Sequence, residues 1–355
     1  MKKILAIVLA LAMVLSLAAC GGSKPAETKV SVFWYDEADV YLSTVRSELN
    51  KALETAGIAY DNQYAGKDQA KQLEQIKTAI AGGTTLLVVN VVTSGDPDIA
   101  QAVLDAAGKV PVVFFNRPIG ADGSEVTLLN GNATSCFIGT DAPEAGHMQG
   151  KMVGDYVLAN FDTVDLNGDG KISYAMFKGE EGNAEAIART QFGVEDADLV
   201  LAENDKPALK FYDDANTSKY LLDQNGAWSA AQGQEHMQTL LSKYSEDNGN
   251  MVEVVIANND DMALGAIAAL QAAGYNKNDG GVTIPVFGVD ATAAAQEAIA
   301  AKSMTGTIKQ DAVGMANAVV KIAENLGLGK GTFDDVVGDL EGTWRVNIPY
   351  SAYSG

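Results

Sequence analysis

The chain has 355 residues, 47% of them hydrophobic, which is enough for two domains that each bury a sizeable core. Its formal net charge of −21 argues against a nucleic acid or an anionic membrane surface as a partner, because phosphate binding needs a basic face. The excess of acidic residues is expected to form a solvated surface that keeps the protein soluble.

The N-terminal residues have the pattern of an export signal. Two lysines precede an apolar stretch over residues 4–17, which is too short to span a bilayer comfortably. The sequence LAACG around Cys20 resembles the lipobox of bacterial lipoproteins, in which cleavage precedes the cysteine and the thiol carries lipid. We therefore expect residues 1–19 to be a signal peptide and residues 20–29 a flexible, lipidated tether. An ordinary signal peptide with an incidental cysteine is the alternative.

Strands and helices alternate along the rest of the chain. The pattern predicts strands over residues 30–35, 86–92, 110–115, 136–139, 171–177, 209–212, 252–257, 284–289 and 305–309, and an extended segment over 343–348. It predicts helices over 40–56, 67–81, 98–107, 142–159, 229–244, 262–273 and 292–301, one beginning at 184 and one ending at 325. Repeated strand–helix units predict parallel sheets with helices on both faces. The run is too long for one sheet of ordinary width, so we expect two doubly wound α/β domains.

A strand, a polar corner and a helix follow one another between residues 251 and 274. Residues 252–257 form a short apolar run rich in β-branched residues, which is typical of a buried parallel strand. The corner, Asn-Asn-Asp-Asp at 258–261, offers side chains that can cap the following helix. Ligands bind at the carboxyl ends of strands in open α/β sheets, so Asn259 is a candidate ligand-binding residue.

The loop over residues 165–173, DLNGDGKIS, matches the first nine positions of an EF-hand calcium loop. Gly170 permits the sharp turn, but position 12 is Met176, where an EF-hand has a bidentate Glu. The oxygen donors, which include one main-chain carbonyl at Lys171, are Asp165, Asn167, Asp169, Lys171 and Ser173. The flanking residues continue into a strand, so the loop is not an EF-hand and needs a carboxylate from elsewhere. A turn rich in Asp and Asn with no ion is the alternative.

These segments resemble periplasmic sugar-binding proteins of the type I fold, and most closely the D-galactose/D-glucose-binding proteins. The resemblance covers about Val30 to Tyr350 and is most specific in PVVFFN (111–116), DLNGDG (165–170), VEVVIANND (252–260) and IPVFGVDA (284–291). It implies an N-terminal lobe of residues 30–137 and 311–342 and a C-terminal lobe of residues 138–310 and 343–355, joined by a hinge. It also implies that Glu253, at the start of the strand before Asn-Asn-Asp, completes a Ca²⁺ site with the loop.

The resemblance further implies that a monosaccharide binds between the lobes. Carboxylates, amides and an arginine bond the hydroxyls at the rim of a pyranose, while aromatic rings, here Tyr41 and Trp228, cover its faces. The implied residues are Asp39, Tyr41, Asn116, Asn183, Glu185, Arg189, Trp228, Asn259, Asp290 and Gln310. Asn183, Glu185 and Gln310 stand where the galactose-binding relatives have His, Asp and Asn, which lengthens or neutralises groups at the rim.

Several of these residues have structural alternatives when they are taken one at a time. Asp290 could only cap the helix after it, and Asn116 could only serve a turn. Glu185 and Arg189 are four residues apart and could form a surface ion pair. Trp228 could be an ordinary core residue. Their joint appearance at strand ends, in the order that the resemblance requires, favours a binding site.

The resemblance implies a lipid-anchored extracytoplasmic protein that binds galactose or glucose, closes its lobes on the sugar and, as a monomer, delivers it to the permease of an ABC importer. The alternatives are a sensing role, in which the closed form is presented to a chemoreceptor or a sensor kinase, and another monosaccharide such as ribose or xylose. An enzyme is not expected, because the chain has only two histidines, both in predicted helices, and Cys136 has no recognisable base motif.

Replacing the predicted lipid-bearing cysteine tests the N-terminal interpretation. Cys20→Ala should release the protein from the membrane fraction, because a tethered soluble domain has no other anchor. Fractionation of cells followed by immunoblotting measures the outcome, and a variant that stays with the membrane would refute the lipobox interpretation.

Overall fold

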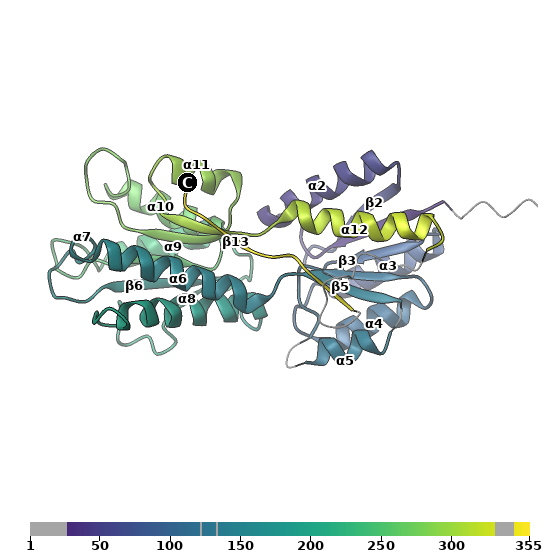
Figure 1. Ribbon diagram of the computed structural model, residues 1–355, viewed down its shortest axis with the longest axis horizontal. Helices are drawn as coiled ribbons and strands as arrows, with labels where there is room; N and C mark the ends of the chain where they lie inside the picture. Colours follow the sequence, from purple (N-terminus) through teal and green to yellow (C-terminus); the bar gives the residue numbers. More distant parts are fainter. Residues whose placement is uncertain (1–26, 121–122, 133, 331–343) are drawn as a thin grey trace, which may run out of the picture.

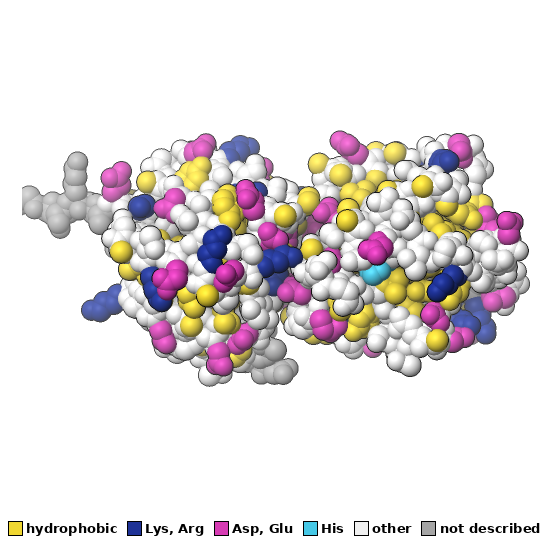
Figure 2. All heavy atoms as spheres, turned by 180° about the vertical axis from the view of Figure 1, so that it is seen from behind, with side chains coloured by type: hydrophobic (Ala, Val, Ile, Leu, Met, Phe, Trp, Pro, Cys, Tyr) yellow, Lys and Arg dark blue, Asp and Glu magenta, His cyan; other side chains and the backbone are white. Residues whose placement is uncertain are grey.

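The computed structural model describes residues 27–120, 123–132, 134–330 and 344–355, which form two lobes joined at a narrow waist (Figure 1). The predicted signal peptide, Cys20 and most of the predicted tether lie outside these residues. Of the helices that the structure describes, none combines the length and the apolar composition needed to cross a membrane. Figure 2 shows acidic side chains scattered over both lobes on the face in view, as expected of a solvated surface.

The first lobe is built on a six-stranded parallel sheet. Its strand order is β12 (Arg345–Asn347), β5 (Ser135–Gly139), β4 (Val112–Phe115), β3 (Leu86–Val89), β1 (Lys29–Trp34) and β2 (Ala59–Tyr64). One face packs against α2 (Val40–Ala56) and α12 (Ala312–Gly327). The other packs against α3 (Gln69–Ala81), α4 (Pro97–Ala107) and α5 (Ser124–Asn130). The sheet is therefore buried on both faces, as parallel sheets require.

The second lobe repeats this plan with a seven-stranded sheet. Its order is β13 (Ser351–Tyr353), β11 (Gly306–Lys309), β10 (Val286–Asp290), β9 (Val254–Ala257), β6 (Ser173–Lys178) and β7 (Lys210–Phe211), with β8 (Leu221–Leu222) also paired to β6. β13 runs antiparallel to β11. One face packs against α9 (Ala230–Leu241), α10 (Asp260–Ala272) and α11 (Ala293–Ala300), and the other against α6 (Ala142–Ala159), α7 (Phe161–Val164) and α8 (Ala184–Ala202). The predicted fold class, two doubly wound parallel-sheet domains of the type I periplasmic-binding-protein fold, is confirmed.

The chain passes between the lobes three times, from β5 to α6, from β11 to α12 and from β12 to β13 (Figure 1). The prediction that every residue from 343 onward belongs to the C-terminal lobe is wrong, because β12 pairs with β5 in the first sheet. The predicted boundary at residue 137 is also too early, since β5 continues to Gly139. Residues 331–342, predicted for the N-terminal lobe, lie outside the described residues.

Long periodic helices are predicted well from the sequence, and short or polar elements are not. α2 and α6 have the predicted bounds. The sequence analysis missed β2, whose residues AYDNQY are mostly polar and half-buried at the edge of the sheet, so they lack the apolar run of a central strand. It also missed α5, which is only 7 residues long.

Glycines on one face of α6 allow α8 to approach closely. A Cβ atom on Gly146 or Gly150 would lie 2.5 or 2.2 Å from a carbonyl oxygen of α8, and one on Gly154 would lie 2.7 Å from the side chain of Val200. The four-residue spacing places all three glycines on the same face. Because α8 carries Arg189, this close packing fixes where the arginine enters the space between the lobes.

Gly150→Ala should therefore destabilise the protein by about 1–3 kcal/mol, because the new methyl group forces α6 and α8 apart. Denaturant unfolding followed by circular dichroism measures the change. Lys151→Ala is the control: its ammonium group makes only a surface pair with Asp155, so a change within about 0.5 kcal/mol is expected. Equal effects of the two substitutions would contradict the packing argument.

Candidate functional site

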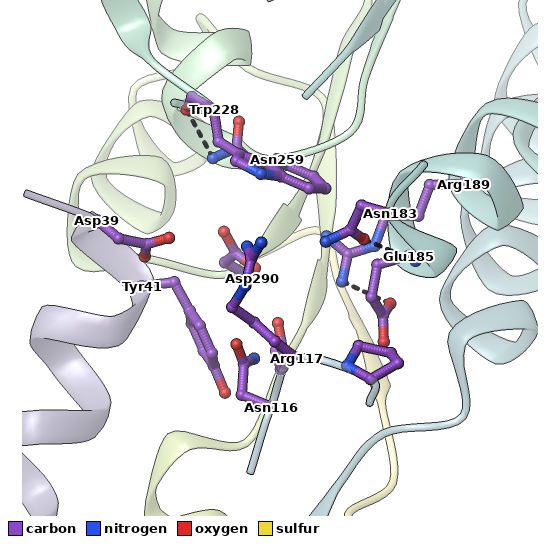
Figure 3. A pocket seen from close by; sticks show the side chains of 12 residues that line it. Asp39, Tyr41, Asn116, Arg117, Asn183, Glu185, Arg189, Trp228, Asn259 and Asp290 are labelled. Atoms are coloured by element: carbon purple, nitrogen blue, oxygen red, sulfur yellow. Dashed lines mark hydrogen bonds and ion pairs between the residues drawn. The ribbon is translucent and has the colours of Figure 1, made fainter. Parts of the chain in front are cut away.

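A pocket with about 450 Å³ of space not filled by protein atoms, part of it open to solvent, lies where the two lobes meet (Figure 3). All the sequence-predicted ligand-binding residues line it, together with Arg117 and Pro118, which the sequence analysis missed although they directly follow Asn116 at the end of β4. The lining residues are Asp39, Tyr41, Asn116, Arg117, Pro118, Asn183, Glu185, Arg189, Trp228, Asn259, Asp290 and Gln310. The structure thus gathers these residues, and their contacts with a ligand remain predictions.

Three lining residues are helix N-caps, which fixes where their side chains can lie. Asp39 Oδ1 accepts a hydrogen bond from the Leu42 amide of α2 at 2.8 Å. Asn183 Oδ1 accepts from the second and third amides after it in α8, at 2.9 and 3.2 Å. Asn259 Oδ1 accepts from Met262 of α10 at 3.0 Å. Because caps satisfy amides that have no partner within their helix, the side chains are held in place before any ligand arrives.

Three other lining residues adopt a left-handed backbone conformation that is uncommon outside glycine. The φ angles are 61° at Asn116, 55° at Trp228 and 125° at Asp290. Such conformations cost on the order of 1–3 kcal/mol each and persist where the surrounding structure determines them. The other seven non-glycine residues with a positive φ in the described part of the chain do not line the cavity, so this backbone conformation agrees with a functional site here but does not identify it by itself.

Two aromatic rings border the cavity. Trp228 and Tyr41 lie on either side of the group of polar side chains (Figure 3). The indole rests on the backbone at Gly179, where a Cβ atom would be only 2.1 Å from the ring, so glycine is required there. Trp228 is buried and also lines the cavity, so its position suits a ligand contact, which stays a prediction.

Polar atoms of three lining residues are buried without a hydrogen-bond partner among the described residues. They are Tyr41 Oη, Arg189 Nε and Gln310 Nε2. Buried polar groups are nearly always hydrogen-bonded, and leaving one unpaired costs about 1–3 kcal/mol. A ligand with several hydroxyls, each able to donate and to accept, would satisfy them.

Arg189 and Glu185 form an ion pair, but not the surface pair that their spacing alone suggested. The nitrogen–oxygen distance is 2.9 Å and the two side chains are only 4% and 8% exposed. Arg189 Nη1 also donates to the main-chain oxygen of Asn258 at 2.9 Å, and Nη2 donates to the Tyr350 hydroxyl at 2.9 Å. The guanidinium is therefore immobilised, and its Nε is the atom that is buried without a hydrogen-bond partner, as described above.

Glu185 is tied to two of the segments that cross between the lobes. Its Oε1 accepts a hydrogen bond from Thr140 at 2.8 Å, and its Oε2 accepts from Tyr350 at 2.9 Å. Thr140 lies between β5 and α6, and Tyr350 between β12 and β13. The sequence analysis missed both residues, because no local pattern shows that they face the cavity wall.

Burial sets the electrostatics of the cavity. Desolvation raises the pKa of Asp290 well above its ordinary value, although the positive charge of Arg189 opposes the shift. Desolvation also raises the pKa of Asp39, against hydrogen bonds from the Leu42 amide and the Tyr35 hydroxyl. A molecule that donates hydrogen bonds to these carboxylates would stabilise their charged forms, so the site favours a ligand rich in hydroxyl donors.

The predicted metal loop is folded tightly around its own side chains. Asp165 Oδ2 accepts from the Gly170 amide at 2.9 Å, Asn167 Oδ1 from the Asp169 amide at 2.8 Å, and Asp169 Oδ1 from the Lys171 amide at 2.8 Å. Gly168 and Gly170 have φ of 67° and 76°, which the turns require. The loop therefore has the wrapped form that its spacing predicts.

Glu253 joins this loop, as the resemblance implied. It is buried, its Oε1 accepts from the Leu166 amide at 2.8 Å, and its Oε2 accepts from the Ser173 amide and hydroxyl at 2.7 and 3.1 Å. The atoms that would coordinate a metal ion here are all oxygens, which suits a hard cation such as Ca²⁺. However, within the described part of the chain no three His, Cys, Asp or Glu side chains converge as a ready-made metal site.

Comparison with known proteins agrees with this fold. A family model described as a periplasmic binding protein domain matches residues 30–331. The D-galactose/methyl-galactoside binding periplasmic protein of Haemophilus influenzae is 31% identical over 356 residues, covering 99% of this chain and 96% of that protein.

Two solved structures share the fold. One is an ABC transporter solute binding protein from Clostridium phytofermentans with bound β-D-glucose, with a TM-score of 0.68, 23% identity, and coverage of 92% of this chain and 94% of that one. The other is an ABC transporter solute binding protein from Bacillus halodurans with bound myo-inositol, with a TM-score of 0.66, 22% identity, and coverage of 94% and 96%. The family match extends over most of the chain, and so the protein belongs to the periplasmic binding proteins, a family of binding proteins and not of enzymes.

Proposed function

We propose that the protein binds a monosaccharide between its lobes and delivers it to the permease of an ABC importer. The observation that carries the proposal is the lining of the cavity, which has aromatic rings on two sides and unsatisfied polar atoms on Tyr41, Arg189 and Gln310. A pyranose has C–H bonds on its faces and hydroxyls at its rim, so it matches both parts of this lining. The transport role follows from the family and from the relatives named above.

We further propose that the sugar is a hexose, either glucose or galactose. Support comes from the H. influenzae relative that is named for galactose and from the C. phytofermentans structure with glucose. A hexopyranose has a C6 hydroxymethyl group that ribose and xylose lack. A buried site built to bond that group leaves polar atoms unpaired when a pentose occupies it.

Isothermal titration with glucose, galactose, ribose and xylose tests this assignment. Pentoses should bind at least roughly tenfold more weakly than the better hexose, because each unpaired polar group costs about 1–3 kcal/mol. Glucose and galactose should differ only modestly. Tight binding of a pentose, with no binding of either hexose, would refute the assignment and point to Asn183, Glu185 and Gln310 as the cause.

Substitutions in the cavity should weaken binding by different amounts. Asp290→Ala should nearly eliminate binding, because sugar hydroxyls in a closed site lose their acceptor. Trp228→Ala should cost about 1–3 kcal/mol of stacking and burial. Lys151→Ala, on the surface of α6, should leave the dissociation constant unchanged. Titration of the folded variants measures these values, and wild-type affinity of Asp290→Ala would place the sugar elsewhere.

We propose two additional features that support this role. Lipid on Cys20 would keep the binding domain at the outer surface of the cell membrane, where the permease is. Ca²⁺ would be held by the oxygens of Asp165, Asn167, Asp169, Lys171 and Ser173 together with Glu253, and would stabilise the second lobe without touching the sugar. The attachment of Glu253 to both ends of the loop supports the metal proposal.

Chelation tests the metal proposal. A ligand that binds only the folded state adds about 2.7 kcal/mol of stability at a concentration a hundred times its dissociation constant, so EGTA should lower the melting temperature and added Ca²⁺ should restore it. Glu253→Gln should melt at the same temperature with and without Ca²⁺. Wild-type melting curves that coincide in EGTA and in Ca²⁺ would contradict the metal proposal.

A further inference from the structure

Arg117 is anchored to the first lobe more firmly than a cavity-lining side chain needs to be. It is only 5% exposed, its Nε donates to the main-chain oxygen of Val91 at 2.9 Å, and its Nη2 donates to that of Val92 at 3.0 Å. Its guanidinium carbon also lies 4.1 Å from the centre of the Tyr35 ring. These contacts hold the planar cation in one orientation, with its outer edge facing the second lobe.

Glu180 of the second lobe meets this outer edge. Arg117 Nη1 lies 3.0 Å from Glu180 Oε2, and Nη2 lies 2.9 Å from Oε1, so the pair is bidentate. Arg117 follows β4 and Glu180 follows β6. Among the ion pairs of the described residues, this is the one that joins the lobes. Figure 2 shows basic and acidic side chains next to each other at the waist.

Glu180 also holds two residues of the cavity wall. Its Oε2 accepts hydrogen bonds from Trp228 Nε1 at 3.3 Å and from Asn183 Nδ2 at 3.1 Å. Asn183 in turn caps α8. One carboxylate therefore connects the first lobe, the indole beside the cavity and the start of the helix that carries Arg189.

We propose that Arg117 and Glu180 form a latch between the lobes, in which Glu180 is a positioning residue that holds Trp228 and Asn183 against the bound molecule. The inference rests on the proposed function, because it requires the lobes to separate when the ligand enters. Arg117 and Glu180 can meet only after the two lobes have closed. The pair therefore slows reopening of the lobes and leaves the rate of ligand entry unaffected. Charge-assisted, bidentate hydrogen bonds of this kind are roughly twice as strong as neutral ones.

The test compares two neighbouring glutamates. Glu180→Gln keeps the shape of the side chain and removes its charge. Glu181→Gln is the matched control, because Glu181 pairs at 2.7 Å with Lys178 of its own lobe and its side chain is 58% exposed. Stopped-flow fluorescence with D-glucose and with D-galactose measures the association and dissociation rate constants, and thermal melting measures stability.

We expect Glu180→Gln to raise the dissociation rate constant at least about tenfold, with the association rate constant within about threefold of wild type. Glu181→Gln should change neither by more than about twofold. Arg117→Lys keeps the charge but loses the planar fork, so it should also speed dissociation. The double variant Arg117→Lys with Glu180→Gln should be no faster than the more affected single variant, because the two residues act as one unit.

An unchanged dissociation rate in Glu180→Gln, or an equal rise in Glu181→Gln, would overturn the latch. Failure of the proposed function is distinguishable, because it would leave the wild type without affinity for either sugar. The latch is then judged by small-angle X-ray scattering of the sugar-free proteins. A larger radius of gyration in Glu180→Gln than in the wild type supports it, and identical profiles overturn it.

Discussion

The buried guanidinium of Arg189 constrains the part of the second lobe that faces the first lobe. A charge removed from water is costly unless it is paired and hydrogen-bonded, and all of this guanidinium except Nε has such partners. Its partners are the main-chain oxygen of Asn258 after β9, the carboxylate of Glu185 in α8 and the hydroxyl of Tyr350 in the last crossing segment. Asp290, at the end of β10, lies in its field. One cation thus fixes the relative positions of a helix, two strand ends and a connection between the lobes.

The cavity uses side chains that also build the fold. Asp39, Asn183 and Asn259 each cap a helix while one side of the same group lines the cavity. A residue with a structural partner keeps its orientation when the ligand leaves, so less conformational freedom is lost when the ligand binds. Whereas the helix caps stabilise the fold, the left-handed backbone at Asn116 and Asp290 is strained and destabilises it. This strain is retained where the two side chains must turn inward.

Much of the fold could be predicted from periodicity alone. The helices α2 and α6 are long and amphipathic enough for their bounds to be read from the sequence. The extended segment that became β12 was also found, but its sheet was assigned wrongly. Which of two sheets a short strand joins depends on the path of the chain between lobes, and a local pattern carries no information about that path.

Some residues of the candidate site could likewise be predicted from local sequence, and others could not. Residues at the ends of predicted strands, such as Asn116, Asn259 and Asp290, could be selected because parallel strands point their carboxyl ends to one edge. Arg117 and Tyr350 could not, because each acts through a partner in the other lobe or on a crossing segment. The loop at Asp165 and its link to Glu253 were anticipated from spacing and resemblance, whereas the ion itself stays a prediction.

The order of the strands has a consequence for how the chain folds during synthesis and export. The second lobe is nearly continuous in sequence, from α6 to β11, so it can assemble as soon as that segment is available. The first lobe needs α12 and β12, which come last, and its contact between Arg345 and Thr140 spans 205 residues of sequence. Contacts between distant residues form slowly because the intervening chain must close into a loop first. The first lobe therefore starts folding first and finishes last, and the outer edge of β5 stays open to pairing with another chain until β12 covers it.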